Sequence, residues 1–328
     1  MSAIFPRATT NFDTKRMSRR KAARLIAQSA AGVLLARSAS GAEPGDATTS
    51  GKLDLLQRAI PSSGEMLPVI GLGTWQVFDV GPSRADRKPL EEVLALFVKL
   101  GGRVVDSSPM YGRAEEVIGD LAAGLGLAQA LFLATKIWTT GKQPGIDSME
   151  RSLAKFRVRR IDLMQVHNLI DAKTHLATLR EWKEQGRIRY LGITHYVASA
   201  YKEVAALLRS EKLDFLQINY SILEREAENQ ILPIAHERGV AVIVNRPFGG
   251  GNLFARLQQK PLPDWAKEFD CHSWAQFLLK WIIAHPAVTC AIPATSNPRH
   301  LEDNMQGGAG RIPDENLRRR MLDMISNL

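Results

Sequence analysis

The sequence predicts an α/β fold, a (β/α)8 TIM barrel preceded by a β-hairpin, and three observations indicate it. Short apolar runs that suit buried strands alternate with amphipathic segments that suit helices, and eight strand-like runs can be counted between residues 66 and 293. Three of these runs end in a charged or titratable residue, as parallel strands that share one mouth would. The 328 residues, 45% of them hydrophobic, suffice for one large barrel or two ordinary domains, and the regular alternation favours the barrel.

The individual elements follow from periodicity and from the residues that begin or end them. Residues 53–60, a polar turn at 61–65 and residues 66–73 predict a hairpin that runs into the first barrel strand. Asp147 is a candidate helix N-cap, and Gly186 ends another predicted helix. The other predicted strands are 103–106, 131–136, 161–167, 188–194, 213–219, 240–245 and 288–293; the predicted helices are 89–100, 114–123, 147–156, 172–185, 198–210, 227–238, 273–284 and 311–328.

Basic residues are concentrated at the amino-terminal end of the chain. The formal net charge is +9, but residues 1–42 carry eight Lys and Arg against Asp13 alone, so this segment contributes +7 and the remainder +2. Because the excess on the remainder is small, no nucleic acid or other polyanion is expected as a partner. The eight basic residues are Arg7, Lys15, Arg16, Arg19, Arg20, Lys21, Arg24 and Arg37.

Residues 1–42 have the organisation of an export signal. Residues 17–21 are basic, residues 25–36 are mildly apolar but too short to span a bilayer, and residues 38–42 are small enough for cleavage. The pair Arg19-Arg20 resembles a twin-arginine signal, which implies contact with export machinery and a periplasmic location. A disordered basic tail on a cytoplasmic protein is the alternative.

A linker and a barrel domain are expected after the leader. Residues 43–52 are rich in Gly, Ala, Thr and Ser, and residues 53–328 carry the strand and helix pattern. Cys271 and Cys290 have neither CxxC spacing nor a histidine array, so no metal site is predicted and buried thiols are the default, although an exported protein can pair them. A monomer is expected.

Three strand-like runs carry the candidate catalytic side chains. Asp106, Lys136 and His167 each end a run, and Tyr111 follows Asp106 on a loop broken by proline and glycine. A phenol is a poor proton donor at neutral pH, and a nearby ammonium such as Lys136 favours its anion, so Lys136 with Asp106 is expected to lower the pKa of Tyr111. Asp106 can supply the counter-charge that a buried lysine needs, and His167 can orient a substrate oxygen. The set suits protonation of a carbonyl oxygen.

Seven short motifs lie in order at the predicted strand ends. They are Gly71-Leu-Gly-Thr-Trp75, Asp106-x4-Tyr111-Gly112, Thr135-Lys136, Val166-His167-Asn168, Leu191-Gly-Ile-Thr194, Gln217-x2-Tyr220 and Ile292-Pro-x5-Pro298. Together they resemble the aldo-keto reductases, and the resemblance covers roughly residues 53–306 and is more specific than any one motif. It implies that Asp106, Tyr111, Lys136 and His167 form a catalytic tetrad, in which Tyr111 protonates the carbonyl oxygen while a nicotinamide hydride attacks the carbon.

The same resemblance implies a cofactor site and a substrate pocket. Gln217 is similar to the residue that bonds the nicotinamide carboxamide, and Asp303 and Asn304 match an adenine-contacting pair. Trp75 and Trp138 resemble pocket-lining aromatics, with plain packing as the alternative. The implied cofactor contacts are Gly73, Thr74, Thr194, His195, Gln217, Asn245, Arg246, Pro247, Phe248, Gly249, Ile292, Ala294, Thr295, Arg299, His300, Asp303 and Asn304.

Three departures from the family pattern bear on the cofactor. The residues after the seventh strand are Asn245-Arg246-Pro-Phe248 rather than an aromatic that stacks on nicotinamide, so Arg246 or Phe248 would have to cover the ring. Ala294 and Thr295 replace a Lys-Ser pair, and Arg299 lies one residue from the expected arginine position, where His300 stands. The resemblance implies NADP(H) rather than NAD(H) as the cofactor, and these departures weaken that preference without reversing it. Residues 249–251 are a triple glycine that suits either a cover over pyrophosphate or a hinge.

Three functions fit these observations to different degrees. The first is reduction of an aldehyde or ketone, or the reverse oxidation of an alcohol or sugar. The second is a nucleotide-sensing binding protein on the same barrel with little turnover. The third is an unrelated barrel lyase or hydrolase using Asp106 and His167, against which the lack of a metal set or nucleophile elbow counts.

Overall fold

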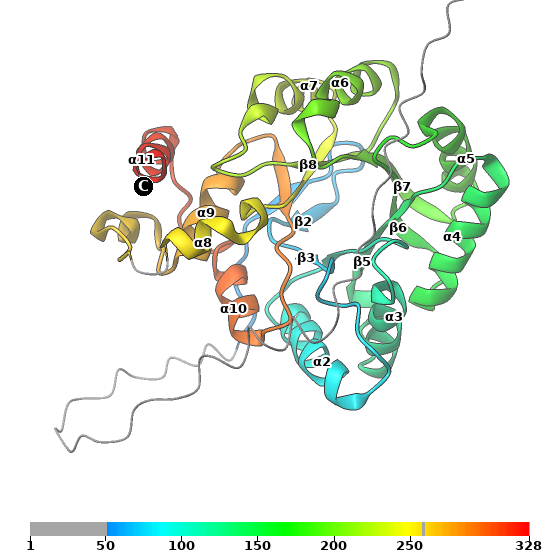
Figure 1. Cartoon of the computed structure of the whole chain (residues 1–328), viewed down its shortest axis with the longest axis horizontal. Coiled ribbons are helices and arrows are strands. Elements are labelled where there is room, and N and C mark those ends of the chain that lie inside the picture. Colours follow the sequence, from blue (N-terminus) through cyan, green and yellow to red (C-terminus); the bar gives the residue numbers. More distant parts are fainter. Residues whose placement is uncertain (1–50, 258–259, 328) are drawn as a thin grey trace, which may run out of the picture. The chain divides into compact units, whose positions relative to one another are not determined.

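The computed structural model describes residues 51–257 and 260–327, and these contain one sheet of eight parallel strands curled into a barrel (Figure 1). The strands lie side by side in chain order from β3 to β10. The (β/α)8 prediction is confirmed, and so is the amino-terminal hairpin of β1 (Gln57–Ala59) and β2 (Met66–Pro68). The barrel strands are β3 Leu72–Gly73, β4 Val104–Asp106, β5 Phe132–Ile137, β6 Ile161–His167, β7 Ile188–Thr194, β8 Phe215–Asn219, β9 Ala241–Asn245 and β10 Val288–Ala291.

Two glycines allow the first and last strands to meet. Gly71 N–H donates to the Ala291 carbonyl at 2.8 Å, and Gly73 N–H donates to the Pro293 carbonyl at 3.0 Å, which closes the barrel. A Cβ on Gly71 would lie 2.9 Å from the Val104 carbonyl oxygen, and one on Gly73 would lie 2.7 Å from the Ile292 carbonyl oxygen. Both positions therefore need glycine because the neighbouring backbone leaves no room for a side chain.

Helices follow the barrel strands and lie outside the sheet (Figure 1). Their apolar faces pack on the outward side chains of the strands in one continuous cluster. The α-helices are α2 Arg84–Lys99, α3 Ala114–Gly124, α4 Lys142–Phe156, α5 Ala172–Glu184, α6 Tyr201–Ser210, α7 Ile231–Glu237, α8 Asn252–Leu257, α9 Trp274–Ile283, α10 Pro298–Gln306 and α11 Glu315–Ser326; short 3-10 helices are Ala128–Ala130, Ala198–Ala200, Glu226–Asn229, Gly249–Gly251 and Asp264–Phe269.

Two helices begin earlier than the sequence predicted. Helix α2 begins at Arg84 rather than at residue 89, because Ser83 is its N-cap and its side chain accepts from Asp86 N–H. Helix α4 begins at Lys142, so Asp147 is not its cap; the Asp147 side chain instead accepts from Gln143 one turn earlier. In both cases the prediction placed the start at a residue that lies inside the helix.

The inside of the barrel is divided into an apolar base and a polar mouth. At the amino-terminal ends of the strands, the rings of Phe132, Tyr190 and Phe215 pack with centroids 5.5 to 6.0 Å apart, and Ile60 and Leu67 of the hairpin join the same cluster. Each large side chain buried this way contributes about 1.5–3 kcal/mol. This packed apolar layer fills the base of the barrel and supports the polar residues at the mouth.

The remaining predictions about organisation concern residues that the structure does not describe or features it does not contain. The predicted export signal at 1–42 and most of the linker lie outside the described residues. Within 51–257 and 260–327, no helix is both long and apolar enough to cross a membrane. The same residues include no group of three or more His, Cys, Asp or Glu side chains placed to hold a metal ion.

Candidate active site

The carboxyl ends of three neighbouring strands bring the predicted polar residues together. Asp106 ends β4, Lys136 is the next-to-last residue of β5 and His167 ends β6. Parallel pairing places β4 beside β5 and β5 beside β6, so these side chains share one end of the barrel. Tyr111 lies on the loop after β4 and is half-buried. The strands are continuous apolar runs because both of their faces are covered.

Asp106 and Lys136 form an ion pair that is shielded from solvent. Lys136 Nζ donates to Asp106 Oδ2 at 2.7 Å and to the Ser107 carbonyl oxygen at 2.6 Å, while the two side chains are 0% and 4% exposed. Burial acts to lower the pKa of Lys136, but the Asp106 carboxylate and the Tyr111 hydroxyl outweigh it, so the pKa is raised. Lys136 is therefore held as an ammonium inside the barrel.

Tyr111 lies against this ammonium, with Lys136 Nζ 5.0 Å from the centre of its ring. Burial raises the pKa of Tyr111 above its ordinary value of 10.0, and Asp106 adds to this, while Lys136 acts in the opposite direction. The predicted net lowering of this pKa by Lys136 and Asp106 is wrong: the ammonium acts as expected, but loss of water destabilises the phenolate more. Tyr111 is thus kept as a protonated phenol.

His167 is an uncharged imidazole in this setting. It is 6% exposed, and burial lowers its pKa from the ordinary 6.5 to about 3, with Lys136 and His195 acting in the same direction. Its Nδ1 atom is buried and has no protein partner, and its ring lies 6.3 Å from that of Trp138. A neutral imidazole can hydrogen-bond a polar substrate atom without bringing a second positive charge beside Lys136.

Gln217 links the ion pair to a strand on the far side of the barrel. Its Nε2 atom donates to Asp106 Oδ1 at 2.7 Å, and its Oε1 atom accepts from Thr194 Oγ1 at 3.1 Å. Gln217 lies on β8 and Thr194 on β7, so the contact spans the barrel from the side opposite Lys136. The sequence predicted Gln217 as a cofactor contact but gave no sign of this bond to Asp106.

The loops after β7 and β9 are joined at the mouth. Asn245 Nδ2 donates to the His195 carbonyl oxygen at 3.1 Å, and His195 Nδ1 accepts the backbone N–H groups of Tyr196 and Val197. This leaves the other ring nitrogen of His195 as the protonated one. Burial also lowers the pKa of His195, so the ring is neutral near pH 7.

The residues after β9 differ in what they contact. Arg246 forms an ion pair with Glu224 at 3.4 Å, and the Phe248 ring packs edge-on against Phe254 with centroids 4.8 Å apart. The three glycines at 249–251 all have positive φ values, of 56, 77 and 90°, which other residues adopt only with strain. Pro247, which precedes this segment, is buried.

The predicted phosphate-binding residues lie at the start of α10. Asn297 is the N-cap and accepts the Arg299 N–H, and Thr295 accepts the Asn297 N–H at 3.0 Å. Arg299 and His300 are exposed. Farther along α10, the Asp303 carboxylate accepts a hydrogen bond from Gln276 at 2.7 Å, and Asn304 is buried. Three other predicted cofactor contacts lie where the first and last strands of the barrel meet: Gly73, Ile292 and Ala294.

The mouth also carries exposed apolar side chains, of which only Trp75 and Trp138 were predicted from the sequence. Trp75 is 53% exposed and Trp138 46% exposed, so neither is plain core packing. Four more large apolar residues are exposed on loops after β4, β7 and β8, and their position just beyond a strand end was the signal that could have identified them. They are Met110, Tyr196, Val197 and Leu223.

Comparisons with known proteins identify the family and the fold of the chain. The Aldo/keto reductase family model matches residues 69–320. Methylglyoxal reductase YeaE of Escherichia coli strain K12 is 28% identical over 256 residues, which cover 76% of this chain and 88% of that protein. NADP-dependent D-sorbitol-6-phosphate dehydrogenase of Malus domestica is 25% identical over 293 residues, which cover 78% of this chain and 90% of that protein. An aldo-keto reductase from Klebsiella pneumoniae, crystallised with NADPH, has the same fold: its TM-score is 0.67 at 24% identity, over 84% of this chain and 95% of that one.

The closed (β/α)8 barrel carries a buried Lys–Asp pair beside a phenol at its mouth, and the aldo/keto reductase family model spans all of these residues. The chain belongs to the aldo/keto reductase family and is an NAD(P)-dependent oxidoreductase.

Proposed function

We propose that the protein reduces a small aldehyde or ketone with NADPH, or catalyses the reverse oxidation of an alcohol or sugar. The observation that carries the proposal is the Lys136 ammonium, held 2.7 Å from Asp106 and 5.0 Å from the centre of the Tyr111 ring in a shielded site. A protonated phenol beside a fixed positive charge is suited to giving its proton to a carbonyl oxygen as negative charge develops there.

The roles of the four residues follow from their contacts. Tyr111 donates the proton, and Lys136 stabilises the phenolate that this leaves behind. Asp106 keeps Lys136 charged and in place through two fixed contacts on its carboxylate, one from Lys136 and one from Gln217. His167, neutral and without a protein partner at Nδ1, orients the carbonyl oxygen toward Tyr111. Trp75 and Trp138 provide an apolar wall for the rest of the substrate.

The residues at the mouth fit a nicotinamide nucleotide. Asn168 Oδ1, Asn245 Oδ1 and Arg246 Nε are buried polar atoms without a protein partner, as expected of groups that face a polar ligand. When bound, the nucleotide supplies the hydride. Gln217, Thr194 and His195 would hold its carboxamide end, and the start of α10 would hold phosphate through backbone N–H groups.

Preference for NADP(H) over NAD(H) is supported by Arg299. This residue lies in the first turn of α10, is exposed, and makes no side-chain hydrogen bond or ion pair within the described part of the chain. A free guanidinium there can bind the additional 2′-phosphate bidentately. Replacing Arg299 with Gln should therefore weaken NADPH binding more than NADH binding.

We also propose that the protein is exported to the periplasm as a folded, cofactor-loaded enzyme and works there as a monomer. The support is the basic start, paired arginines and apolar stretch of residues 17–36, together with the small residues at 38–42. A cytoplasmic location is the alternative. Fusing residues 1–50 to a reporter that is active only after folded export, with Arg19 and Arg20 both changed to Lys in the control, separates the two.

The deciding experiment measures nucleotide binding and turnover on the same preparation. Wild type, Tyr111→Phe and the matched control Tyr196→Phe are titrated with NADPH and NADH by fluorescence, and then each is given a series of small aldehydes, ketones and sugars. All three should bind NADPH, while only Tyr111→Phe should lose turnover, by about 100- to 10,000-fold. Binding without turnover in wild type would replace catalysis by nucleotide sensing, and no binding would overturn the proposal.

A further inference from the structure

A cavity of about 440 Å³ lies at the opposite end of the barrel from the candidate active site. Its wall carries five arginines and a single carboxylate, Asp162. The residues come from the amino-terminal edges of four neighbouring strands, β4 to β7, from the 3-10 helix before β5 and from the turn between α4 and β6. The cavity therefore belongs to the base of the barrel. The arginines are Arg103, Arg157, Arg159, Arg160 and Arg189.

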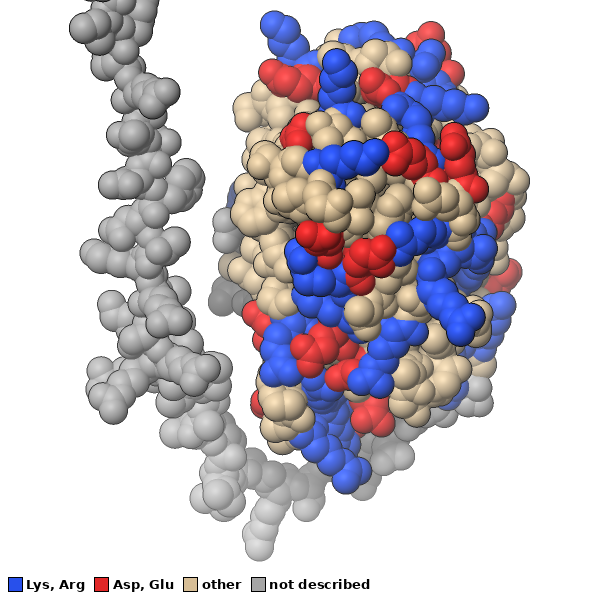
Figure 2. All heavy atoms as spheres, turned by 90° about the vertical axis from the view of Figure 1, so that its right-hand side faces the viewer, with Lys and Arg blue, Asp and Glu red and all other residues tan. Residues whose placement is uncertain are grey.

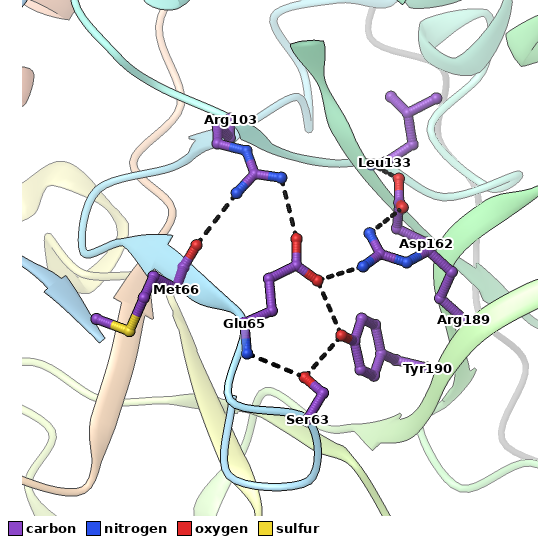
Figure 3. A network of polar contacts seen from close by, with 8 residues as sticks. All are labelled: Ser63, Glu65, Met66, Arg103, Leu133, Asp162, Arg189 and Tyr190. Atoms are coloured by element: carbon purple, nitrogen blue, oxygen red, sulfur yellow. Dashed lines mark hydrogen bonds and ion pairs between the residues drawn. The ribbon is translucent and has the colours of Figure 1, made fainter. Parts of the chain in front are cut away.

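Two of these arginines are fixed by acidic residues of the hairpin and of β6 (Figure 3). Glu65 Oε1 accepts from Arg103 at 3.0 Å, and Glu65 Oε2 accepts from Arg189 and, at 2.8 Å, from the Tyr190 hydroxyl. Asp162 accepts from Arg189 at 2.8 Å with one oxygen and from the Leu133 N–H with the other. Arg103 and Arg189 are therefore preorganised, because their guanidinium groups are held in place before any ligand arrives.

Arg159 and Arg160 differ because they have no such partner. Both are exposed, and within residues 51–257 and 260–327 neither makes a side-chain hydrogen bond or an ion pair with a carboxylate. Arg157, two residues earlier, is paired with Asp120. Like charges set side by side repel one another, so this turn holds positive charge that its own surroundings do not neutralise.

A second cavity of about 390 Å³ adjoins the first and extends the basic lining. It shares Arg160 and Arg189 with the first cavity and adds Lys183, together with the hydroxyl groups of Ser62 and Ser63. The two linings together thus contain six basic side chains and one acidic one. Figure 2 shows the flank bearing α4 and α5, where basic and acidic side chains are interspersed. Lys183 is paired with Asp214 at 2.6 Å, so, among the described residues, the charge that no carboxylate neutralises in the two linings is that of Arg159 and Arg160.

We propose that these joined cavities bind a ligand with two or more phosphate groups. Guanidinium groups match phosphate oxygens bidentately, and hydroxyl and tyrosine groups at the rim can complete the contacts. The spacing of the basic residues over two adjoining cavities suits several phosphates rather than one carboxylate. The phosphates can belong to a free polyphosphorylated compound or to phospholipid headgroups. In either case the ligand also contacts Arg189, which is tied to the hairpin through Glu65.

Calorimetry on the full chain saturated with NADPH tests the site, because nucleotide then occupies the phosphate contacts of the active site. Inorganic pyrophosphate is the probe for free ligands, and sedimentation with phosphatidylglycerol vesicles is the probe for headgroups. Wild type should bind at least one probe. The double variant Arg159→Gln/Arg160→Gln should bind it at least about tenfold more weakly, with turnover unchanged.

The charge-matched control is Arg209→Gln/Arg238→Gln, which removes two exposed arginines from elsewhere on the barrel. This control should bind like wild type. Binding of pyrophosphate identifies a free polyphosphorylated ligand, and binding of vesicles alone identifies headgroups. Failure of wild type to bind either probe overturns the proposal, and so does equal weakening in both double variants, because it would show attraction to net charge rather than a site.

Discussion

At each end of the barrel a carboxylate holds basic side chains in place, but the surroundings of the two carboxylates differ. At the mouth, Asp106 holds Lys136 with side-chain exposures of 4% and 0%. At the base, Glu65 holds Arg103 and Arg189, and these three side chains are 19%, 40% and 28% exposed. Each carboxylate contacts two donors or more, so hydrogen-bond geometry alone does not distinguish the two ends.

The difference between them lies in the water that remains around the charges. Without water, the Lys136–Asp106 pair acts strongly on its neighbours, and the pKa values of Tyr111, Lys136 and His167 all move from their ordinary values. At the base, water still screens the charges, so the network around Glu65 fixes the hairpin without creating a group suited to catalysis. Burial, rather than the residue types, determines which charge network can do chemistry.

The largest effect is expected from removing the cation at the mouth. Lys136→Met leaves the Asp106 carboxylate buried without its counter-charge, which costs about 3–5 kcal/mol of unfolding free energy. Turnover should also fall by at least about 100-fold, since Tyr111 loses the charge that stabilises its phenolate. Denaturant unfolding and steady-state kinetics measure the two effects. Adding Asp106→Asn should restore much of the stability and none of the turnover; a double variant as unstable as the single one would contradict this account.

A smaller change in the free energy of unfolding is expected from substitutions at two buried glutamines inside the barrel, and it should differ between them. Gln217→Leu removes a donor from the Asp106 carboxylate, and a hydrogen bond to a charged group contributes about 1.5–3 kcal/mol. Gln165 is equally buried, but neither of its amide atoms has a protein partner. Gln165→Leu should therefore leave the unfolding free energy unchanged or raise it. A loss with Gln165→Leu as large as with Gln217→Leu would mean that Gln165 has a partner such as a buried water.

These contrasts mark what could be predicted from the sequence. The alternation of apolar runs and helices predicted the barrel, and polar residues at strand ends predicted Asp106, Lys136 and His167, because parallel strands bring their carboxyl ends together. The bond between Gln217 and Asp106 could not be predicted, since it joins β8 to β4 across the barrel and depends on side-chain direction. The net pKa of Tyr111 was predicted wrongly for a related reason: charge partners can be guessed from sequence, but the extent of burial cannot.

The ends of helices were also predicted less well from the sequence than the helices themselves. Residue 89 was predicted as the start of a helix from the spacing of its apolar residues, yet Ser83 caps α2, which begins at Arg84, more than one turn earlier. The arginines of the basal cavity were also missed, because Arg103, Arg159 and Arg189 lie far apart in the sequence and meet only when three strand edges align.

At the base, Glu65→Gln should have a moderate effect that depends on pH. Partial burial acts to raise the pKa of Glu65, but hydrogen bonds from Tyr190, Arg189 and Arg103 outweigh it and hold the pKa below the ordinary 4.5. A carboxyl with a lowered folded-state pKa stabilises the fold above pH 4.5, and this is lost as the pH falls through the folded value. At pH 7 the variant should lose about 1–2 kcal/mol, and the loss should shrink below pH 4.5. Glu184→Gln, at an exposed position, is the control; equal losses in both would contradict the role of Glu65.

The smallest effect is expected where an ordinary histidine would titrate. Because the pKa of His167 is about 3, the imidazole stays neutral from pH 5 to 8, and kcat/KM should show no change with a midpoint near 6.5. The free energy of unfolding should depend on pH instead. His167 takes up a proton near pH 6.5 in the unfolded chain but stays neutral in the folded protein, so the free energy of unfolding decreases as the pH falls from 6.5 toward 3. His167→Gln should reduce this acid weakening while lowering turnover at every pH. The opposite result would be a kinetic midpoint near 6.5 in wild type that disappears in His167→Gln. It would show that water reaches this ring, and that the charges at the mouth are screened by water as those at the base are.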